Sequence, residues 1–173
     1  MKKILLFLLI FYQLSAIDFL KTSGDTIIDE NGKKILLKGF GLGGWVVLEG
    51  YMWNCYIEHA STSRMENSIN YLVGEEKKNE FFDLYRKNYI TEKDIKYISE
   101  NDFNALRIPL HYRDFSPNFL EFSTKGFELL DSLITWGYRH NIYLILDMHA
   151  APGAQNTNDF SDSEINGDSE LFT

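Results

Sequence analysis

Ile142-Tyr143-Leu144-Ile145-Leu146-Asp147-Met148-His149 is a near-continuous apolar run that becomes polar at its end. Such runs are typical of strands in parallel sheets, which are covered on both faces. Because side chains alternate along a strand, Asp147 and His149 share one face with Tyr143 and Ile145, and the other face stays apolar. The run therefore predicts a buried strand over residues 142–149 with a polar carboxyl end.

The segments before this run alternate between helix and strand patterns. Short strands are expected near residues 37–41 and 104–109, the second ended by Pro109. Helices are expected near residues 76–88, 91–101 and 124–140. This βαβ order predicts an α/β fold with a parallel sheet, because right-handed crossovers bring successive strands into parallel register.

Local signals support two of these helices. Thr91, followed by Asp94 three residues later, predicts a capping box at the start of the second helix. In the third helix, apolar residues recur at three- and four-residue steps and predict one buried face. These residues are Phe127, Leu130, Ile134 and Tyr138.

The segment at residues 25–45 contains residue types that favour turns. Asn31-Gly32 lies between the β-prone runs 26–28 and 35–37 and predicts a hairpin over residues 25–38, since both turn residues accept positive φ. The glycine-rich residues 39–45 follow, where the backbone can approach another surface closely.

The first sixteen residues have the pattern of a secretory signal peptide. Met1-Lys2-Lys3 is basic, residues 4–12 are apolar, and Ala16 offers a small residue for cleavage. A membrane span needs roughly 20 apolar residues, so this run is too short for an anchor; the alternative is an N-terminal core helix. We expect a mature chain of residues 17–173 that is exported to the periplasm, the cell surface or the medium and is not membrane-bound after cleavage.

Composition excludes several classes of function. The formal net charge of −8 disfavours nucleic acid as a partner. The single cysteine, Cys55, cannot form an intramolecular disulfide. Zinc-ligand spacing and nucleotide-binding motifs are absent from the sequence, so neither a metal nor a cofactor is expected. The oligomeric state stays open.

Polar residues gather where the predicted strands end. Ligands of parallel α/β folds bind at the carboxyl ends of strands, so Arg107, His111, Asp147 and His149 are candidate site residues. Each has a structural alternative: Arg107 could close an ion pair within the sheet, and Asp147 and His149 could satisfy each other. We expect the acidic run from Asp159 to Glu170 to lie on the solvated surface.

Three blocks of sequence, residues 39–51, 104–111 and 147–156, together resemble glycoside hydrolase family 5 in content, order and spacing. The branch they resemble is exo-β-1,3-glucanase-like, with cellulase-like β-glucanases close by. The resemblance implies the N-terminal part of a (β/α)8 barrel: about three βα units and an N-terminal hairpin, with the barrel incomplete after its third strand. Residues 17–173 would form this portion.

The resemblance also implies site roles. Arg107 matches the arginine that hydrogen-bonds the catalytic nucleophile, and His149 matches a histidine lining the sugar subsite. Glu49 and Tyr51 match the pair that holds the terminal glucose, and Asp159 matches an acidic contact to the same sugar. Gly50 replaces a frequent proline and Asn158 a frequent aromatic residue, so the glucan linkage and the choice of endo or exo action stay open.

The implied activity is retaining hydrolysis of β-1,3- or β-1,4-glucan, a step in polysaccharide catabolism. Retention needs two carboxyl groups about 5 Å apart, and in this family they are glutamates after the fourth and seventh strands. The catalytic acid/base and nucleophile are therefore expected to be absent from these 173 residues, and the chain alone is expected to be inactive. The alternative is a noncatalytic secreted half-barrel that binds glucan or a partner protein.

Overall fold

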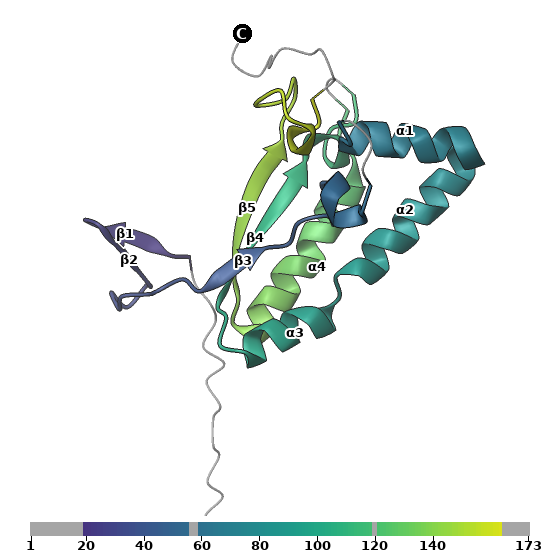
Figure 1. Ribbon diagram of the computed structural model, residues 1–173. Helices are drawn as coiled ribbons and strands as arrows, with labels where there is room; N and C mark the ends of the chain where they lie inside the picture. Colours follow the sequence, from purple (N-terminus) through teal and green to yellow (C-terminus); the bar gives the residue numbers. More distant parts are fainter. Residues whose placement is uncertain (1–18, 56–58, 119–120, 164–173) are drawn as a thin grey trace, which may run out of the picture.

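The computed structural model describes residues 19–55, 59–118 and 121–163. In these ranges a small parallel sheet carries its helices on one side, and a two-stranded hairpin projects from the start of the chain (Figure 1). The predicted signal peptide, residues 1–16, lies outside the described residues and stays a prediction.

The sheet contains three strands in the order β3-β4-β5: β3 (Gly39–Gly41), β4 (Ala105–His111) and β5 (Tyr143–Ala150). Both pairings are parallel, with Gly41 opposite Arg107 and Arg107 opposite Ile145. The prediction of an α/β fold with three parallel strands is therefore confirmed.

Strand β4 does not end at Pro109, where the sequence predicted its end. The N–H groups of odd-numbered residues in β4 point toward β3, as shown by the bond from Ala105 N–H to the Lys38 carbonyl. Pairing with β3 stops at Arg107, and Leu42 donates the last bond, to the Arg107 carbonyl. The missing N–H of Pro109 therefore falls beyond the paired edge, and the strand continues to His111.

The described ranges contain four α-helices: α1 (Thr62–Val73), α2 (Glu75–Tyr89), α3 (Glu92–Glu100) and α4 (Thr124–His140). Helices α3 and α4 pack on the sheet, and α1 and α2 pack on each other. Helices α2, α3 and α4 confirm the predicted helices, and the Thr91–Asp94 capping box is present. Helix α1 was not predicted, although Met65, Ile69, Leu72 and Val73 recur at helical spacing; this stripe is only partly buried, since Leu72 and Val73 are exposed. No helix in the described ranges is long and apolar enough to span a membrane.

The N-terminal hairpin forms one turn earlier than predicted. Strand β1 (Lys21–Ser23) pairs antiparallel with β2 (Thr26–Ile28) across a turn at Gly24, whose φ is +61°. The predicted turn at Asn31-Gly32 also forms, but residues 35–37 are not a strand, and the pairing there is a single bridge between Ile28 and Lys34.

The main core lies between the sheet and helices α3 and α4. It includes Leu106 and Ile108 from β4, Ile95 from α3 and Leu133 from α4. The prediction for the α4 face was wrong in detail, since Gly126, Leu133 and Gly137 are its buried residues, whereas three of the four predicted positions are exposed. The physical reason is Gly137, where a Cβ would lie 2.9 Å from the Ile142 carbonyl oxygen, so that the helix rotates its small residue toward the sheet.

Candidate active site

Strands β4 and β5 bring three polar side chains together on one face of the sheet. Arg107 Nη2 lies 2.5 Å from Asp147 Oδ2 and 3.0 Å from His149 Nδ1. His149 Nδ1 is also 3.0 Å from Asp147 Oδ2. Asp147 and His149 share a face through strand alternation, and the parallel register places Arg107 beside them, so the sequence prediction of this cluster matches the structure.

His111, the fourth residue of that prediction, does not join the cluster. The register of β4 and β5 shifts after Leu110, so that His111 pairs with Ala150 instead of His149. Such a bulge redirects the side chains that follow it. His111 is buried and lies 2.8 Å from the carboxylate of Asp162, in a different network.

Glu49 and Tyr51 lie together after β3. Glu49 precedes the short helical turn η1 (Gly50–Trp53), and the Tyr51 hydroxyl donates to Glu49 Oε2 at 2.6 Å. A Cβ at position 43 would lie 2.5 Å from Glu49 Oε1, so Gly43 leaves the room that this carboxylate occupies. Tyr51 is 72% exposed, so this polar pair is open to a ligand.

Asp159 and Phe160 link the two groups of residues. They lie in the short turn η3 (Asp159–Ser161), which packs against the end of β5. The ring of Phe160 stacks on His149 at a centroid distance of 6.0 Å. The hydrogen bond to Glu49, partial burial and the negative charges of Glu49 and Asp159 raise the pKa of Tyr51. The turn η3 therefore places Asp159 and Phe160 beside His149, at the end of β5.

Trp45, which follows the glycines after β3, belongs to the core. It is 1% exposed, and its indole N–H donates to the Arg86 carbonyl at 2.8 Å. It therefore offers no surface to a sugar.

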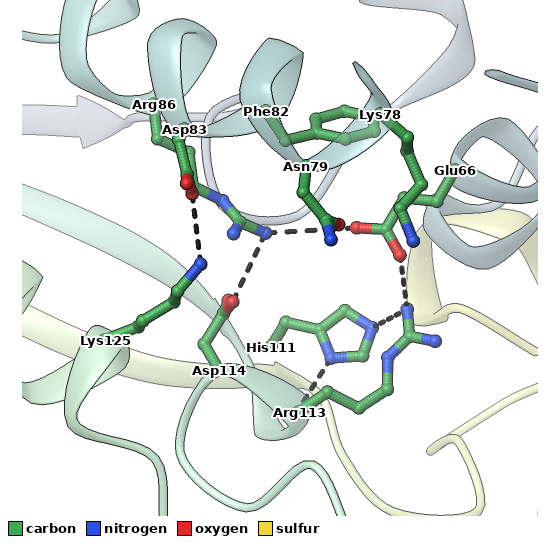
Figure 2. A pocket seen from close by; sticks show the side chains of 10 residues that line it. All are labelled: Glu66, Lys78, Asn79, Phe82, Asp83, Arg86, His111, Arg113, Asp114 and Lys125. Atoms are coloured by element: carbon green, nitrogen blue, oxygen red, sulfur yellow. Dashed lines mark hydrogen bonds and ion pairs between the residues drawn. The ribbon is translucent and has the colours of Figure 1, made fainter. Parts of the chain in front are cut away.

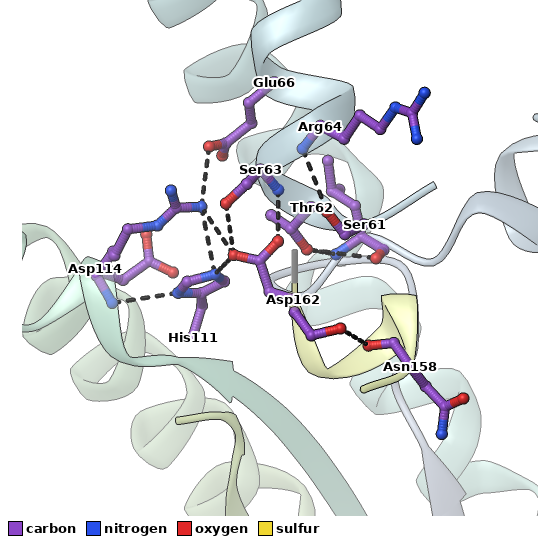
Figure 3. Close-up of polar contacts among 12 residues, drawn as sticks. Ser61, Thr62, Ser63, Arg64, Glu66, His111, Asp114, Asn158 and Asp162 are labelled. Carbon is purple, nitrogen blue, oxygen red and sulfur yellow. Dashed lines mark hydrogen bonds and ion pairs between the residues drawn. The ribbon is translucent and has the colours of Figure 1, made fainter. Parts of the chain in front are cut away.

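The interpretation of the acidic run as solvated surface was wrong for Asp162. Its side chain is 7% exposed and accepts hydrogen bonds from the N–H and the hydroxyl of Ser63, both at 2.6 Å (Figure 3). Burial disfavours the charged form, but the bonds from His111 and Ser63 outweigh it and lower the pKa of Asp162. Sequence carried no signal for this role, because the partners are about fifty and one hundred positions away.

A polar pocket of about 220 Å³ lies beside this buried network (Figure 2). Ion pairs cross it, between Arg86 and Asp114 at 3.2 Å and between Arg113 and Glu66 at 3.2 Å. These pairs join α1 and α2 to the segment after β4. Within the described ranges, no cluster of three His, Cys, Asp or Glu side chains is arranged to hold a metal ion.

The family model described as cellulase (glycosyl hydrolase family 5) matches residues 74–171, more than half of the chain. The chain belongs to glycosyl hydrolase family 5. A beta-xylosidase of Phanerodontia chrysosporium is 34% identical over 149 residues, which are 84% of this chain and 30% of that protein. A probable glucan 1,3-beta-glucosidase A of Emericella nidulans is 33% identical over 122 residues, 69% of this chain and 30% of the relative.

Solved structures show the same fold. The rutinosidase of Aspergillus niger superimposes with a TM-score of 0.59 at 20% identity, over 72% of this chain and 36% of the other. The structure named AoRut gives 0.60 at 23% identity, over 79% and 38%. This family 5 chain thus spans about 30% of the length of the curated relatives it matches, and the described elements are the first part of an incomplete barrel.

Proposed function

We propose that the chain forms the sugar-recognition part of a retaining β-glucan hydrolase of family 5. The carrying observation is the cluster of Arg107, Asp147 and His149 on β4 and β5, with the exposed pair Glu49 and Tyr51 following β3, the strand next to β4. Membership in the family and a relative named glucan 1,3-beta-glucosidase support a β-linked glucan as substrate.

Each residue has a role in this proposal. Glu49 and Asp159 are carboxylates that accept hydrogen bonds from sugar hydroxyls, and Tyr51, whose single O–H is donated to Glu49, offers its hydroxyl oxygen as a further acceptor. His149 lines the subsite beside the bond to be cleaved. Arg107 supplies a fixed guanidinium that favours the ionised form of a nearby carboxylate nucleophile.

The cleavage step needs groups beyond these. Retention requires an acid/base and a nucleophile on carboxyl groups about 5 Å apart. Asp147 is already engaged by Arg107 and His149, and Glu49 by Tyr51. We propose that two glutamates from the rest of a family 5 barrel supply the chemistry, and that the 173-residue chain alone releases no sugar.

The test compares the chain alone with the chain joined to the C-terminal part of a related family 5 enzyme. Laminarin and carboxymethyl-cellulose are the substrates, and NMR of the first product gives its anomeric configuration. The completed protein should hydrolyse one of them with retention. Turnover by the unextended chain would mean that Glu49, Asp147 or Asp159 is a catalytic carboxylate.

A substitution tests the recognition site within the completed protein. Glu49→Gln removes a charged acceptor for a sugar hydroxyl and should raise KM by about tenfold while kcat stays nearly constant. The matched control is Glu92→Gln on α3, whose carboxylate bonds Arg139 and His140 away from the site. An inactive completed protein that still binds laminarin would favour the alternative of a noncatalytic glucan-binding half-barrel.

We also propose that the protein is exported. The basic start, the short apolar run and Ala16 support this, and an insoluble or extracellular polysaccharide substrate is consistent with it. N-terminal sequencing of the protein from the medium or the periplasm should begin near residue 17. An intact Met1 on a protein retained in the cytoplasm would contradict export.

A further inference from the structure

The loop after β5 carries Asp159 and Phe160 into the candidate site, and its own side chains determine where it lies. On the β5 side, the Gln155 amide donates to the His149 carbonyl at 2.7 Å. Asn156 Oδ1 accepts the Ser161 hydroxyl at 2.7 Å and the Asn158 N–H at 2.9 Å. These bonds fold the segment 156–161 into a closed turn.

The side chain of Asp162 hydrogen-bonds the other end of this turn to two elements that are distant in sequence (Figure 3). One carboxylate oxygen accepts the Ser63 N–H at 2.6 Å, and the other accepts the Ser63 hydroxyl at 2.6 Å. The second oxygen also lies 2.8 Å from His111 Nε2 and 3.3 Å from Arg113 Nη2. The side chain thus joins the loop to the first turn of α1 and to the end of β4.

The contact with α1 has a clear physical basis. The first N–H groups of a helix lack partners within the helix, and a negative charge there is favoured by the helix dipole. The Ser61 side chain accepts a hydrogen bond from the N–H of Arg64, and the carboxylate of Asp162, which is distant in sequence, accepts one from the N–H of Ser63. Asp162 is therefore held at both of its oxygens, and its backbone N–H closes η3 on the Asp159 carbonyl at 2.9 Å.

The side chain of Asp159 makes only a local hydrogen bond within the described ranges, accepted from the N–H of Phe160 at 2.9 Å. Its placement therefore depends on the backbone of η3, which the neighbouring Asp162 holds. We propose that Asp162 is a positioning residue, which sets Phe160 against His149 and Asp159 next to them at the end of β5, for recognition of the terminal sugar hydroxyls. This inference rests on the proposed function and adds a residue that contacts the site only through its neighbours.

Hydrogen exchange on the full chain tests the positioning. Asp162→Ala should speed exchange of the backbone amides of residues 156–161 by about tenfold or more through local opening, while Leu106 and Ile108 in β4 stay protected. Asp162→Asn keeps acceptor and shape toward Ser63 and should give a smaller increase. The control Glu66→Gln removes a carboxylate from the same network on α1, and it should leave the loop unchanged.

The values of KM and kcat of the completed protein distinguish a positioning role from a purely structural one. Asp162→Ala should raise KM by about tenfold with kcat within about twofold, since the misplaced groups bind sugar and do not react. Asp162→Asn should recover part of the loss. Equal KM values for Asp162→Ala and Glu66→Gln, or loop amides that stay protected in Asp162→Ala, would overturn the inference.

The two proposals fail separately. If the completed protein without substitutions does not hydrolyse glucan, the proposed function fails, and the exchange experiment alone decides whether Asp162 positions the loop. If Asp162→Ala speeds exchange equally in the loop and in β4, Asp162 has a general stabilising role and the positioning inference is wrong.

Discussion

Arg107 on β4 is paired with Asp147 on β5 across neighbouring strands, with Nη2 and Oδ2 2.5 Å apart. The side chain of Arg107 is 43% exposed, so the pair faces an open side of the sheet and is not a buried structural bridge. A further carboxylate can therefore approach the guanidinium of Arg107. The ion pair with Asp147 fixes the orientation of this guanidinium.

The exposure of Arg107 predicts a separation between stability and activity. An exposed ion pair contributes about 0–1 kcal/mol, so Arg107→Ala should change the free energy of unfolding of the chain by no more than that. In the completed enzyme the same change should lower kcat by on the order of 10²-fold, as loss of one preorganised donor does. Denaturant unfolding and kinetics measure the two effects, and Lys96→Ala on α3 is the control for an exposed ion pair. Full activity of Arg107→Ala would contradict the assignment.

The phenol of Tyr51 should lose its proton at a higher pH than an ordinary tyrosine does. Its pKa lies above the ordinary value of 10.0, chiefly because its hydroxyl donates to Glu49 and its ionised form would lie beside that carboxylate. The neutral phenol should therefore persist above pH 10. The difference in alkaline absorbance between the chain and Tyr51→Phe isolates this titration from those of the other tyrosines. In a Glu49→Gln background the midpoint should fall toward 10.0, and an unchanged midpoint would show that the pair does not form.

Asp162 should make stability depend on acid pH. Because its pKa is lowered on folding, its contribution is present above the unfolded value of about 3.9 and is lost as pH falls through the folded value. At neutral pH, Asp162→Asn should lower the free energy of unfolding by about 1–3 kcal/mol, and this difference should shrink below about pH 4.

Other groups facing Asp162 must be separated in that measurement. His111 and Arg113 face it from the end of β4, and Glu66 on α1 lies behind Arg113. Denaturant unfolding from pH 3 to pH 8 should therefore include Glu66→Gln. A stability difference between Asp162→Asn and the parent that does not vary with pH would contradict the linkage.

The outer side of β5 and α4 should drive association. Leu146 and Met148 on β5 and Ile134 and Tyr138 on α4 are large apolar residues with 44–53% of their surface exposed. Uncovered strand edges and apolar patches recruit partners. The chain should be oligomeric or aggregated in light scattering, and Leu146→Lys with Met148→Lys should shift it toward monomer. Tyr97→Lys on α3 is the control, and a monomeric parent with one cooperative unfolding transition would contradict the prediction.

Elements with strong local signals could be predicted from sequence. The capping box of Thr91 and Asp94 and the uniform apolarity of residues 142–149 are decided by neighbours in the chain. Helix α1 has a helical spacing of Met65, Ile69, Leu72 and Val73 that could have indicated it, but its position depends on contacts outside the helix, such as the bond from the Leu48 N–H to Thr62 Oγ1 at 2.9 Å. The hairpin was misassigned because two adjacent turns both suit positive φ, and only pairing energy chooses between them.

The amino-acid sequence alone determined the family, the parallel α/β order and the shared face of Asp147 and His149, because composition, motif spacing and strand alternation act over short distances. Only the tertiary structure decided the partners of His111 and Asp162. A one-residue register shift between β4 and β5 turned His111 away from the site, and burial against α1 made Asp162 an anchor. Both outcomes arise from contacts between residues about forty to one hundred positions apart, whose energies depend on how the layers pack.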